Sequence, residues 1–300
     1  MYILCYQVQS NKIDSIIEDL QINDIYDVFY ESLLEITTDD NGYGYIEKDD
    51  EPTVLNVAFE GQREDLQGFK DKIDPIINEV CFNIYEEDNK YDDFSIPAID
   101  IDETWVLASP EEVVEGKKKI NFVSQGAFGT GLHETTQDLL RIILAKDYTN
   151  KRVLDIGTGS GILSIATGVK GASEVVALDI RDVRHEVELN ASLNNLDNIK
   201  VLVGDALTNE VDVEGKFDWI YINIGGEETE FFMNFIKDHL KVNGSLLVSG
   251  LVEWSFDKIK AIVESYGFNL TEKHQSNEWC TAIFENKVNI PVSLRDGFSD

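Results

Sequence analysis

The stretch Arg152-Val-Leu-Asp-Ile-Gly-Thr-Gly-Ser-Gly-Ile162 decides how the rest of the chain is interpreted. It begins as an apolar strand, continues through Gly157, Gly159 and Gly161, and runs into a helical pattern of apolar residues. A strand that ends in glycines and turns into a helix exposes backbone N–H groups and the positive end of the helix dipole to a ligand. The stretch therefore predicts a site for a nucleoside-bearing cofactor, although a glycine-rich turn without a ligand is an alternative.

The spacing of the glycines bears on which cofactor this is. A dinucleotide fingerprint, G-x-G-x-x-G, would place its third glycine at position 162, where this chain has Ile162. The strand also ends in Asp155, whose carboxylate would repel a pyrophosphate. S-adenosylmethionine carries a sulfonium and an ammonium but no phosphate. The pattern D-x-G-x-G-x-G therefore favours S-adenosylmethionine over a dinucleotide.

The composition limits the class of protein. The chain has 300 residues, enough for two domains, and 43% of them are hydrophobic, which suffices for a real core. Its formal net charge of −32 argues against direct binding of nucleic acid. The charge suits a basic partner, although acidity that only keeps a protein soluble is an equal alternative.

Cysteine usage and the N-terminal residues predict a cytoplasmic protein without a metal. Cys5, Cys81 and Cys280 lie far apart in apolar runs, and no Cys/His cluster has metal-ligand spacing, so buried free thiols are expected. The N-terminal residues lack a basic n-region, and no run approaches eighteen apolar residues, so no membrane association is expected.

The first 88 residues predict a small ferredoxin-like α+β domain. Their patterns indicate the order βαββαβ, which is the split βαβ arrangement. The predicted elements are strand 2–8, helix 11–20, strand 28–37, strand 53–59, helix 63–77 and strand 80–85. Residues 89–103 are rich in acidic side chains. Because these charges repel one another, the segment is predicted to be an extended linker.

Residues 104–286 predict a doubly wound parallel sheet, because strand and helix patterns alternate. Strands are expected near 119–123, 152–156, 174–178, 199–203, 217–222, 245–248, 269–273 and 279–284, with helices between most of them. Ligands of such a sheet lie outside the carboxyl ends of its strands. Residues 287–300 are predicted to be a polar tail.

Three polar residues follow strands of this sheet at its ligand edge. Asp179 is placed to accept both hydroxyls of a ribose, or else to cap the helix after it. Asp205 could hold the adenine amine or cap a turn. Asn223 lies where the sheet would open toward a donor methyl group, although a turn-forming role before Gly225 is a rival.

These residues resemble a family of bacterial ribosomal-protein methyltransferases, whose enzymes methylate the large-subunit protein at the stalk base (L11). The matching segments are Ala127-Phe-Gly-Thr-Gly-Leu-His-Glu-Thr-Thr136, Leu154–Gly161, Asn223, Gly244–Leu251 and Glu278-Trp279. The resemblance implies a Rossmann-like class I methyltransferase fold, S-adenosylmethionine as cofactor, and transfer of methyl groups to lysine or α-amino nitrogens. It also implies that the small N-terminal domain grips the basic ribosomal substrate.

The resemblance also implies which residues contact S-adenosylmethionine. They are Thr136, Gly157, Asp179 and Asn223, to which the glycine turn adds Gly159 and the third strand end adds Asp205. Without the family, Thr136 is a hydroxyl in the first turns of a helix, where a local hydrogen bond is common. His133 could act as a base, but a structural role is the stronger interpretation. No acid–base pair stands out, so no catalytic residue is predicted.

The chain departs from the family pattern at three places: Glu134 replaces a proline, Arg181-Asp182 replaces Asp-Pro, and Ile224-Gly225-Gly226 replaces Ile-Leu after the asparagine. Three alternatives therefore stand beside the protein N-methyltransferase. They are a methyltransferase acting on another protein or a small molecule, a non-catalytic module that binds S-adenosylmethionine or docks on ribosomes, and a nicotinamide-dependent oxidoreductase.

Overall fold

The computed structural model describes residues 1–23, 25–30, 34–40, 42–48, 51–86, 97–125, 129–208 and 210–287. Apart from residues 40–42, the chain divides into a unit of Met1–Asp39 with Tyr43–Phe94 and a unit of Ser95–Asp300. The point of division falls in segment 87–96, outside the described residues. Much of the predicted linker and nearly all of the predicted tail likewise fall outside them.

The N-terminal unit has a four-stranded sheet with two helices. Its elements are β1 (Tyr2–Gln9), α1 (Ile13–Ile22), β2 (Val28–Tyr30), β5 (Pro52–Phe59), α2 (Leu66–Ile77) and β6 (Cys81–Glu86). The strand order is β2-β5-β1-β6, and every neighbouring pair is antiparallel. This is the arrangement that the order βαββαβ predicts for a ferredoxin-like domain.

One prediction within this unit was wrong. Residues 28–37 do not form a single strand, because β2 ends at Tyr30 and a separate strand β3 (Leu34–Thr38) pairs with β4 (Tyr43–Glu47) in a two-stranded sheet of its own. β3 and β4 pair antiparallel as a hairpin, so the second half of the predicted strand belongs to this hairpin and not to the main sheet.

The core of the N-terminal unit lies between its sheet and its helices. Leu4, Tyr6 and Leu55 point from the strands toward Ile16 of α1 and Ile73 of α2, and all five side chains are buried. Every second residue of β1 therefore faces the helices, while Ile3 and Cys5 on its other face are also buried.

The second unit contains a seven-stranded mixed sheet. Its strands are β10 (Arg152–Ile156), β11 (Glu174–Asp179), β12 (Ile199–Val203), β13 (Phe217–Ile222), β14 (Leu240–Val252), β15 (Asn269–Ser276) and β16 (Trp279–Glu285). They lie in the order β12-β11-β10-β13-β14-β16-β15. The strands from β12 to β14 are parallel, whereas β16 runs antiparallel to both of its neighbours.

The expectation of an all-parallel sheet was therefore wrong at one edge. The two-residue turn between β15 and β16 makes them a hairpin, because a parallel pair needs a crossover of a dozen or more residues. The alternation of helices and strands correctly predicted the five parallel strands that carry the site.

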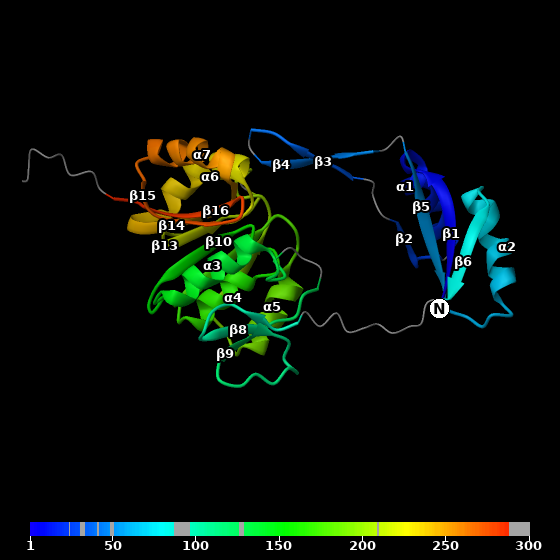
Figure 1. The fold of residues 1–300 in the computed structure, drawn as a ribbon, viewed down its shortest axis with the longest axis horizontal. Helices are drawn as coiled ribbons and strands as arrows, with labels where there is room; N and C mark the ends of the chain where they lie inside the picture. The colour runs from blue at the N-terminus through cyan, green and yellow to red at the C-terminus, as the bar shows by residue number, and fades with distance from the viewer. Residues whose placement is uncertain are drawn as a thin grey trace, which may run out of the picture. The chain divides into compact units, whose positions relative to one another are not determined.

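Helices cover both faces of this sheet. Figure 1 shows α6 (Gly226–His239) and α7 (Glu253–Ser265) on one side, and α3 (Glu134–Ala145), α4 (Ile162–Val169) and α5 (Arg184–Leu193) on the other. Neighbouring residues of β10 point to opposite layers: Val153 packs in the core with α3 and α4, and Leu154 in the core with α6 and α7. This is the doubly wound arrangement.

A three-stranded sheet precedes α3, formed by β7 (Ile99–Asp100), β8 (Trp105–Ala108) and β9 (Lys118–Asn121). The strand near 119–123 was predicted, but β7 and β8 were not. All four residues of β8 are buried, so this small sheet extends the core on the α3 side.

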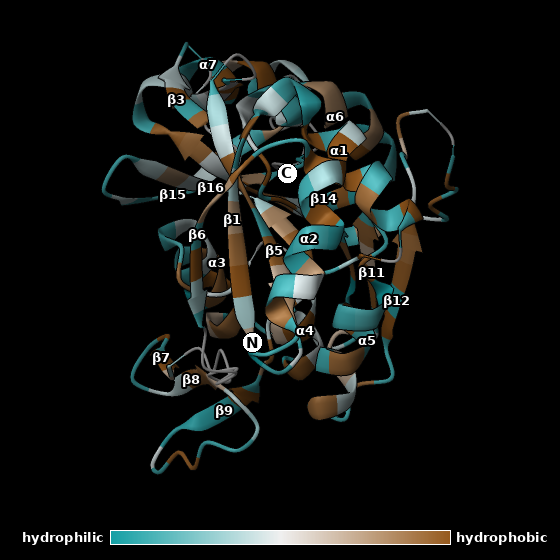
Figure 2. Cartoon of the chain, turned by 90° about the vertical axis from the view of Figure 1, so that its right-hand side faces the viewer, coloured by the Kyte–Doolittle hydropathy of each residue, from teal (hydrophilic) through white to brown (hydrophobic). Residues whose placement is uncertain are grey.

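Hydropathy colouring shows helices banded in brown and teal, as expected for elements with one buried face (Figure 2). Among the described residues, no helix has the length and apolar character needed to cross a bilayer. The three cysteines are free; Cys5 and Cys280 are buried, and Cys81 is half-buried.

Candidate functional site

A cavity of about 640 Å³ lies at the carboxyl ends of the parallel strands. Each of five neighbouring strands contributes residues at or just beyond its end: Gly204 to Leu207 after β12, Asp179 at the end of β11, Gly157 after β10, Asn223 after β13, and Gly250 in β14. The volume suits a ligand of cofactor size, and the location is the one expected of a doubly wound fold.

The glycine turn forms the floor of the cavity, and its backbone has positive φ angles that glycine tolerates better than other residues. Gly157, Gly159 and Gly161 have φ angles of +70°, +54° and +78°, in the left-handed region that side chains disfavour. A Cβ on Gly161 would also lie 2.8 Å from Cγ2 of Val187. Gly157 and Gly159 line the cavity, as the sequence predicted for the cofactor site.

Asp179 joins the ends of two neighbouring strands. Its Oδ2 accepts a 2.9 Å hydrogen bond from the backbone N–H of Gly159, and its Oδ1 accepts one of 3.0 Å from the backbone N–H of Arg181. The side chain is buried and lines the cavity. A carboxylate can accept about four hydrogen bonds, so Asp179 retains capacity for a pair of ligand hydroxyls.

Asp155, in contrast, does not line the cavity. It is buried beneath the glycine turn, where its Oδ2 accepts 2.8 Å hydrogen bonds from the hydroxyls of Thr158 and Ser164. Burial, with a smaller contribution from the charge of Asp179, raises the pKa of Asp155 to about 6. Asp155 therefore connects the end of β10 to the first turn of α4, and its side chain does not face the ligand cavity.

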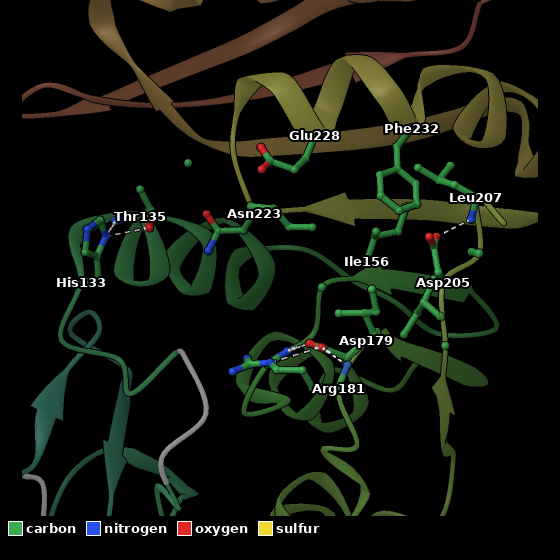
Figure 3. Close-up of a pocket in the computed structure, with 18 of the residues that line it drawn as sticks. His133, Thr135, Ile156, Asp179, Arg181, Asp205, Leu207, Asn223, Glu228 and Phe232 are labelled. Atoms are coloured by element: carbon green, nitrogen blue, oxygen red, sulfur yellow. Dashed lines mark hydrogen bonds and ion pairs between the residues drawn. The ribbon is translucent and has the colours of Figure 1, made fainter. Parts of the chain in front are cut away.

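Asp205 has one of the two roles that the sequence left open, that of closing a turn, and it also faces the cavity. Its Oδ1 accepts a 2.8 Å hydrogen bond from the backbone N–H of Leu207, which closes a turn, and the residue also lines the cavity. Figure 3 shows it beside Phe232 and Leu207, at the end of the cavity farthest from His133. The apolar side chains of Leu207 and Phe232 line the same end, which suits a flat heterocycle (Figure 3).

Asn223 lines the cavity on the other side of the glycine turn. Its side-chain amide makes no hydrogen bond within the described part of the chain, and so it is free to bind a ligand. The next residue, Ile224, places its side chain over the turn: a Cβ on Gly157 would lie 2.6 Å from Cδ1 of Ile224.

The loop before α3 is fastened to the glycine turn. Ser160 Oγ donates a buried 2.8 Å hydrogen bond to the carbonyl oxygen of Gly129, and Gly131 packs so closely that a Cβ there would lie 2.6 Å from Cδ2 of Leu107. The two motifs that suggested the family therefore touch each other. Ala127 and Phe128 of the first motif lie outside the described residues.

Of the two threonines that end this motif, Thr135 lines the cavity and Thr136 does not. Thr136 is buried, and its Oγ1 has no hydrogen-bond partner within the described residues. His133 caps α3: its Nδ1 accepts a 3.3 Å hydrogen bond from the backbone N–H of Thr135. Its ring lies edge-on to Trp279, with 4.8 Å between the ring centroids. This geometry supports the structural interpretation of His133.

Sequence reasoning did not assign several other residues of the lining. They are Thr135, Arg181, Ile224, Glu228, Phe232, Gly250 and Trp279. The sequence could have predicted two of them. Glu228 and Phe232 are four residues apart, and so they share one face of the helix that follows Asn223. Within the described residues, no cluster of three or more His, Cys, Asp or Glu side chains could hold a metal ion.

The family model for ribosomal protein L11 methyltransferase (PrmA) matches residues 85–287. The chain belongs to this family. A ribosomal protein L11 methyltransferase of Fusobacterium nucleatum is 40% identical over 164 residues, which cover 54% of this chain and 52% of the relative. One from Nitratiruptor sp. is 29% identical over 260 residues, which cover 82% and 89% of the two chains.

Among solved structures, a ribosomal protein L11 methylase from Lactobacillus delbrueckii subsp. bulgaricus superposes with a TM-score of 0.56 at 29% identity, covering 64% of this chain and 99% of that one. This likeness confirms the class I methyltransferase fold. The chain spans about half the length of the first curated ribosomal protein L11 methyltransferases that it matches.

Proposed function

We propose that this protein transfers a methyl group from S-adenosylmethionine to amino groups of a basic large-subunit ribosomal protein. The observation that carries the proposal is the arrangement of Asp205, Asp179, Gly157 and Asn223 at the ends of four adjacent parallel strands around one cavity. Family membership supports the reaction type, and the named relatives support the ribosomal substrate.

The order of the strands assigns a part of the cofactor to each residue. Neighbouring strands lie about 4.8 Å apart, so the four residues form a row along the edge of the sheet. Asp205 and the apolar end would hold adenine, Asp179 the ribose hydroxyls, and Gly157 with Gly159 the chain that carries the sulfonium. Asn223 would then lie near the methyl group.

The charge of the cavity fits this cofactor. Asp179, Asp205 and Glu228 contribute three carboxylates to the lining, against one guanidinium from Arg181. S-adenosylmethionine carries a net positive charge, whereas the pyrophosphate of a dinucleotide would be repelled. The electrostatics therefore support S-adenosylmethionine over the nicotinamide alternative.

Thr136 remains in the proposal for a separate reason. Leaving a buried hydroxyl without a partner costs about 1–3 kcal/mol, and the Oγ1 of Thr136 is such a hydroxyl. It lies in the first turn of α3, next to Thr135 of the cavity wall. The family resemblance assigns this hydroxyl to the cofactor, and the first turn of α3 would have to shift for the hydroxyl to reach a ligand in the cavity.

S-adenosylmethionine supplies an electrophilic methyl group on a positively charged sulfur. The described lining offers no acid–base pair aimed at a substrate, because Asp179 and His133 are held by local hydrogen bonds. The contribution of the chain is therefore to align the reacting atoms and to exclude water. Alignment alone can supply about 7–11 kcal/mol.

Lysine and α-amino nitrogens of a basic protein are the proposed acceptors. The net charge of −32 would attract such a substrate over long distances. We assign substrate recognition to the N-terminal domain, residues 1–88, followed by an acidic linker at 89–103. The transfer reaction is assigned to the domain at 104–286, with a polar tail at 287–300.

The test is methyl transfer from labelled S-adenosylmethionine to the purified proteins of a bacterial large ribosomal subunit. Label in the L11 protein supports the proposal, and label in another protein only would redirect it to a different substrate. Tight binding of S-adenosylmethionine in calorimetry without label in any protein would favour a non-catalytic binding module. Binding of NADH but not S-adenosylmethionine would revive the oxidoreductase.

A further inference from the structure

Two polar side chains of the cavity lining, Asn223 and Glu228, make no hydrogen bond or ion pair within the described residues. The carboxylate of Asp179 accepts two backbone N–H groups, and that of Asp205 accepts one. Glu228 is therefore the carboxylate of the described lining that makes no hydrogen bond or ion pair within the described residues, although its Oε2 lies close to Gly225, where a Cβ would be 2.6 Å from it.

Glu228 lies on the methyl-transfer side of the cavity. It belongs to the first turn of α6, which begins at Gly226, three residues after Asn223. Figure 3 shows Glu228 and Asn223 on the side of the cavity away from Asp205. Because adenine is assigned to the Asp205 end, Glu228 lies where the methyl acceptor would enter.

The helix dipole does not by itself explain this placement. An acidic residue in the first turn of a helix is stabilised by the positive end of the dipole. Glu227 occupies the same turn but does not line the cavity. Glu228 also lies against the N-cap residue, since a Cβ on Gly225 would be 2.6 Å from its Oε2. Glu227 is therefore a control for negative charge in this turn, and only Glu228 of the two faces the cavity.

We propose that Glu228 binds the cationic amino group of the methyl acceptor and so selects amines over neutral hydroxyl or amide acceptors. The inference rests on the proposed function, because it places the acceptor beside Asn223. An exposed carboxylate beside an ammonium gives a charge-assisted hydrogen bond, which is stronger than the bond a neutral acceptor would make.

The reaction gives the carboxylate a second effect. The acceptor arrives as an ammonium and releases one proton to solvent, and the neutral nitrogen then forms a bond to the methyl carbon while the carbon–sulfur bond breaks. The electron pair of that bond stays on sulfur, which becomes a neutral thioether, and the nitrogen gains the positive charge. Glu228 therefore stabilises charge that moves toward it during the transfer.

The experiment compares Glu228→Gln with Glu227→Gln, a matched change one residue away that does not face the cavity. Four quantities are measured in the full chain: the KM and the kcat for the protein acceptor, the affinity for S-adenosylhomocysteine, and the affinity for sinefungin. Sinefungin replaces the methylated sulfur of the cofactor with a carbon that bears an ammonium, so it places a cation at the methyl position without any reaction.

The inference expects Glu228→Gln to raise the KM for the acceptor and to weaken sinefungin by about fivefold or more. Binding of S-adenosylhomocysteine should stay within about twofold, as should all four quantities in Glu227→Gln. Equal effects of the two variants, or loss of S-adenosylhomocysteine binding in Glu228→Gln, would overturn the inference. A wild-type protein without transfer would refute the proposed function, and the sinefungin comparison would still test Glu228.

Discussion

The backbone N–H of Gly159 donates a 2.9 Å hydrogen bond to Oδ2 of Asp179, across the gap between the ends of β10 and β11. The glycine turn and the acidic residue are twenty positions apart in the chain, and this bond sets the position of each relative to the other. A ligand that touches one of them therefore meets the other in a fixed geometry, which lowers the entropic cost of binding.

Replacing Asp179 with alanine should weaken binding of S-adenosylmethionine by at least about tenfold, because two hydrogen bonds to a charged group would be lost. Asp182→Ala is the control, since Asp182 is exposed, pairs with Arg184 and does not line the cavity. Calorimetric titration measures both. Unchanged affinity in Asp179→Ala would refute the ribose assignment.

Replacing Ser160 with alanine removes the hydrogen bond that fastens the loop at Gly129 to the glycine turn. Because the carbonyl oxygen of Gly129 would lose a buried partner, the free energy of unfolding should fall by about 1–3 kcal/mol. Ser173→Ala removes the same type of bond at an exposed site, to the carbonyl oxygen of Lys151, and should cost less than about 0.5 kcal/mol. Urea unfolding of both variants measures the two changes. Equal losses in the free energy of unfolding would show that the buried hydrogen bond stabilises the fold no more than the exposed one.

The elevated pKa of Asp155 predicts a pH-dependent stability. Its pKa is raised to about 6 by burial, so between its ordinary value and 6 the folded protein binds more protons than the unfolded chain. Stability contributed by this group therefore falls as pH rises through that window, and the cost is complete above pH 6. At neutral pH it amounts to about 2–3 kcal/mol.

The measurement compares Asp155→Asn with the wild type in urea unfolding from pH 4 to pH 7. Asparagine retains an oxygen that can accept from Thr158 and Ser164 but does not ionise. The stability of the variant relative to the wild type should therefore rise with pH. A constant difference across the range would show that Asp155 has an ordinary pKa.

Gly161 and Gly116 form a matched pair for testing the glycine turn. Their φ angles are +78° and +79°, but a Cβ would collide with Val187 only at Gly161 and would meet open space at Gly116. Both alanine variants carry the cost of a left-handed backbone, about 1–2 kcal/mol. Gly161→Ala should cost about 1–3 kcal/mol more, because it also overpacks the contact with α5. Thermal unfolding gives the difference, and equal losses would contradict the packing argument.

Replacing Thr136 with valine should leave the free energy of unfolding unchanged or raise it, because the lost hydroxyl has no partner. Affinity for S-adenosylmethionine should fall by about threefold to tenfold if that hydroxyl bonds to the cofactor. Thr135→Val is the comparison, since Thr135 lines the cavity and also bonds to His133. An affinity loss confined to Thr135→Val would transfer the proposed contact to Thr135.

Local patterns predicted much of the fold because they depend on short-range periodicity. The order of elements in the N-terminal unit and the five parallel strands of the second followed from alternation and helical spacing. The hairpin β3–β4 and the antiparallel strand β16 did not, because a strand pattern carries no information about its partner.

The sequence by itself determined the glycine turn, a glycine spacing that differs from the dinucleotide fingerprint, and the strand ends Asp179, Asp205 and Asn223 that gather around one cavity. It could do so because parallel strands bring their carboxyl ends to one edge of the sheet whatever the details of packing. Only the tertiary structure decided which side chains face that cavity. Thr135 lines it and Thr136 does not, and Glu228 lines it and Glu227 does not, because the rotation of α3 and α6 against the sheet is fixed by core packing and cannot be read from neighbouring positions.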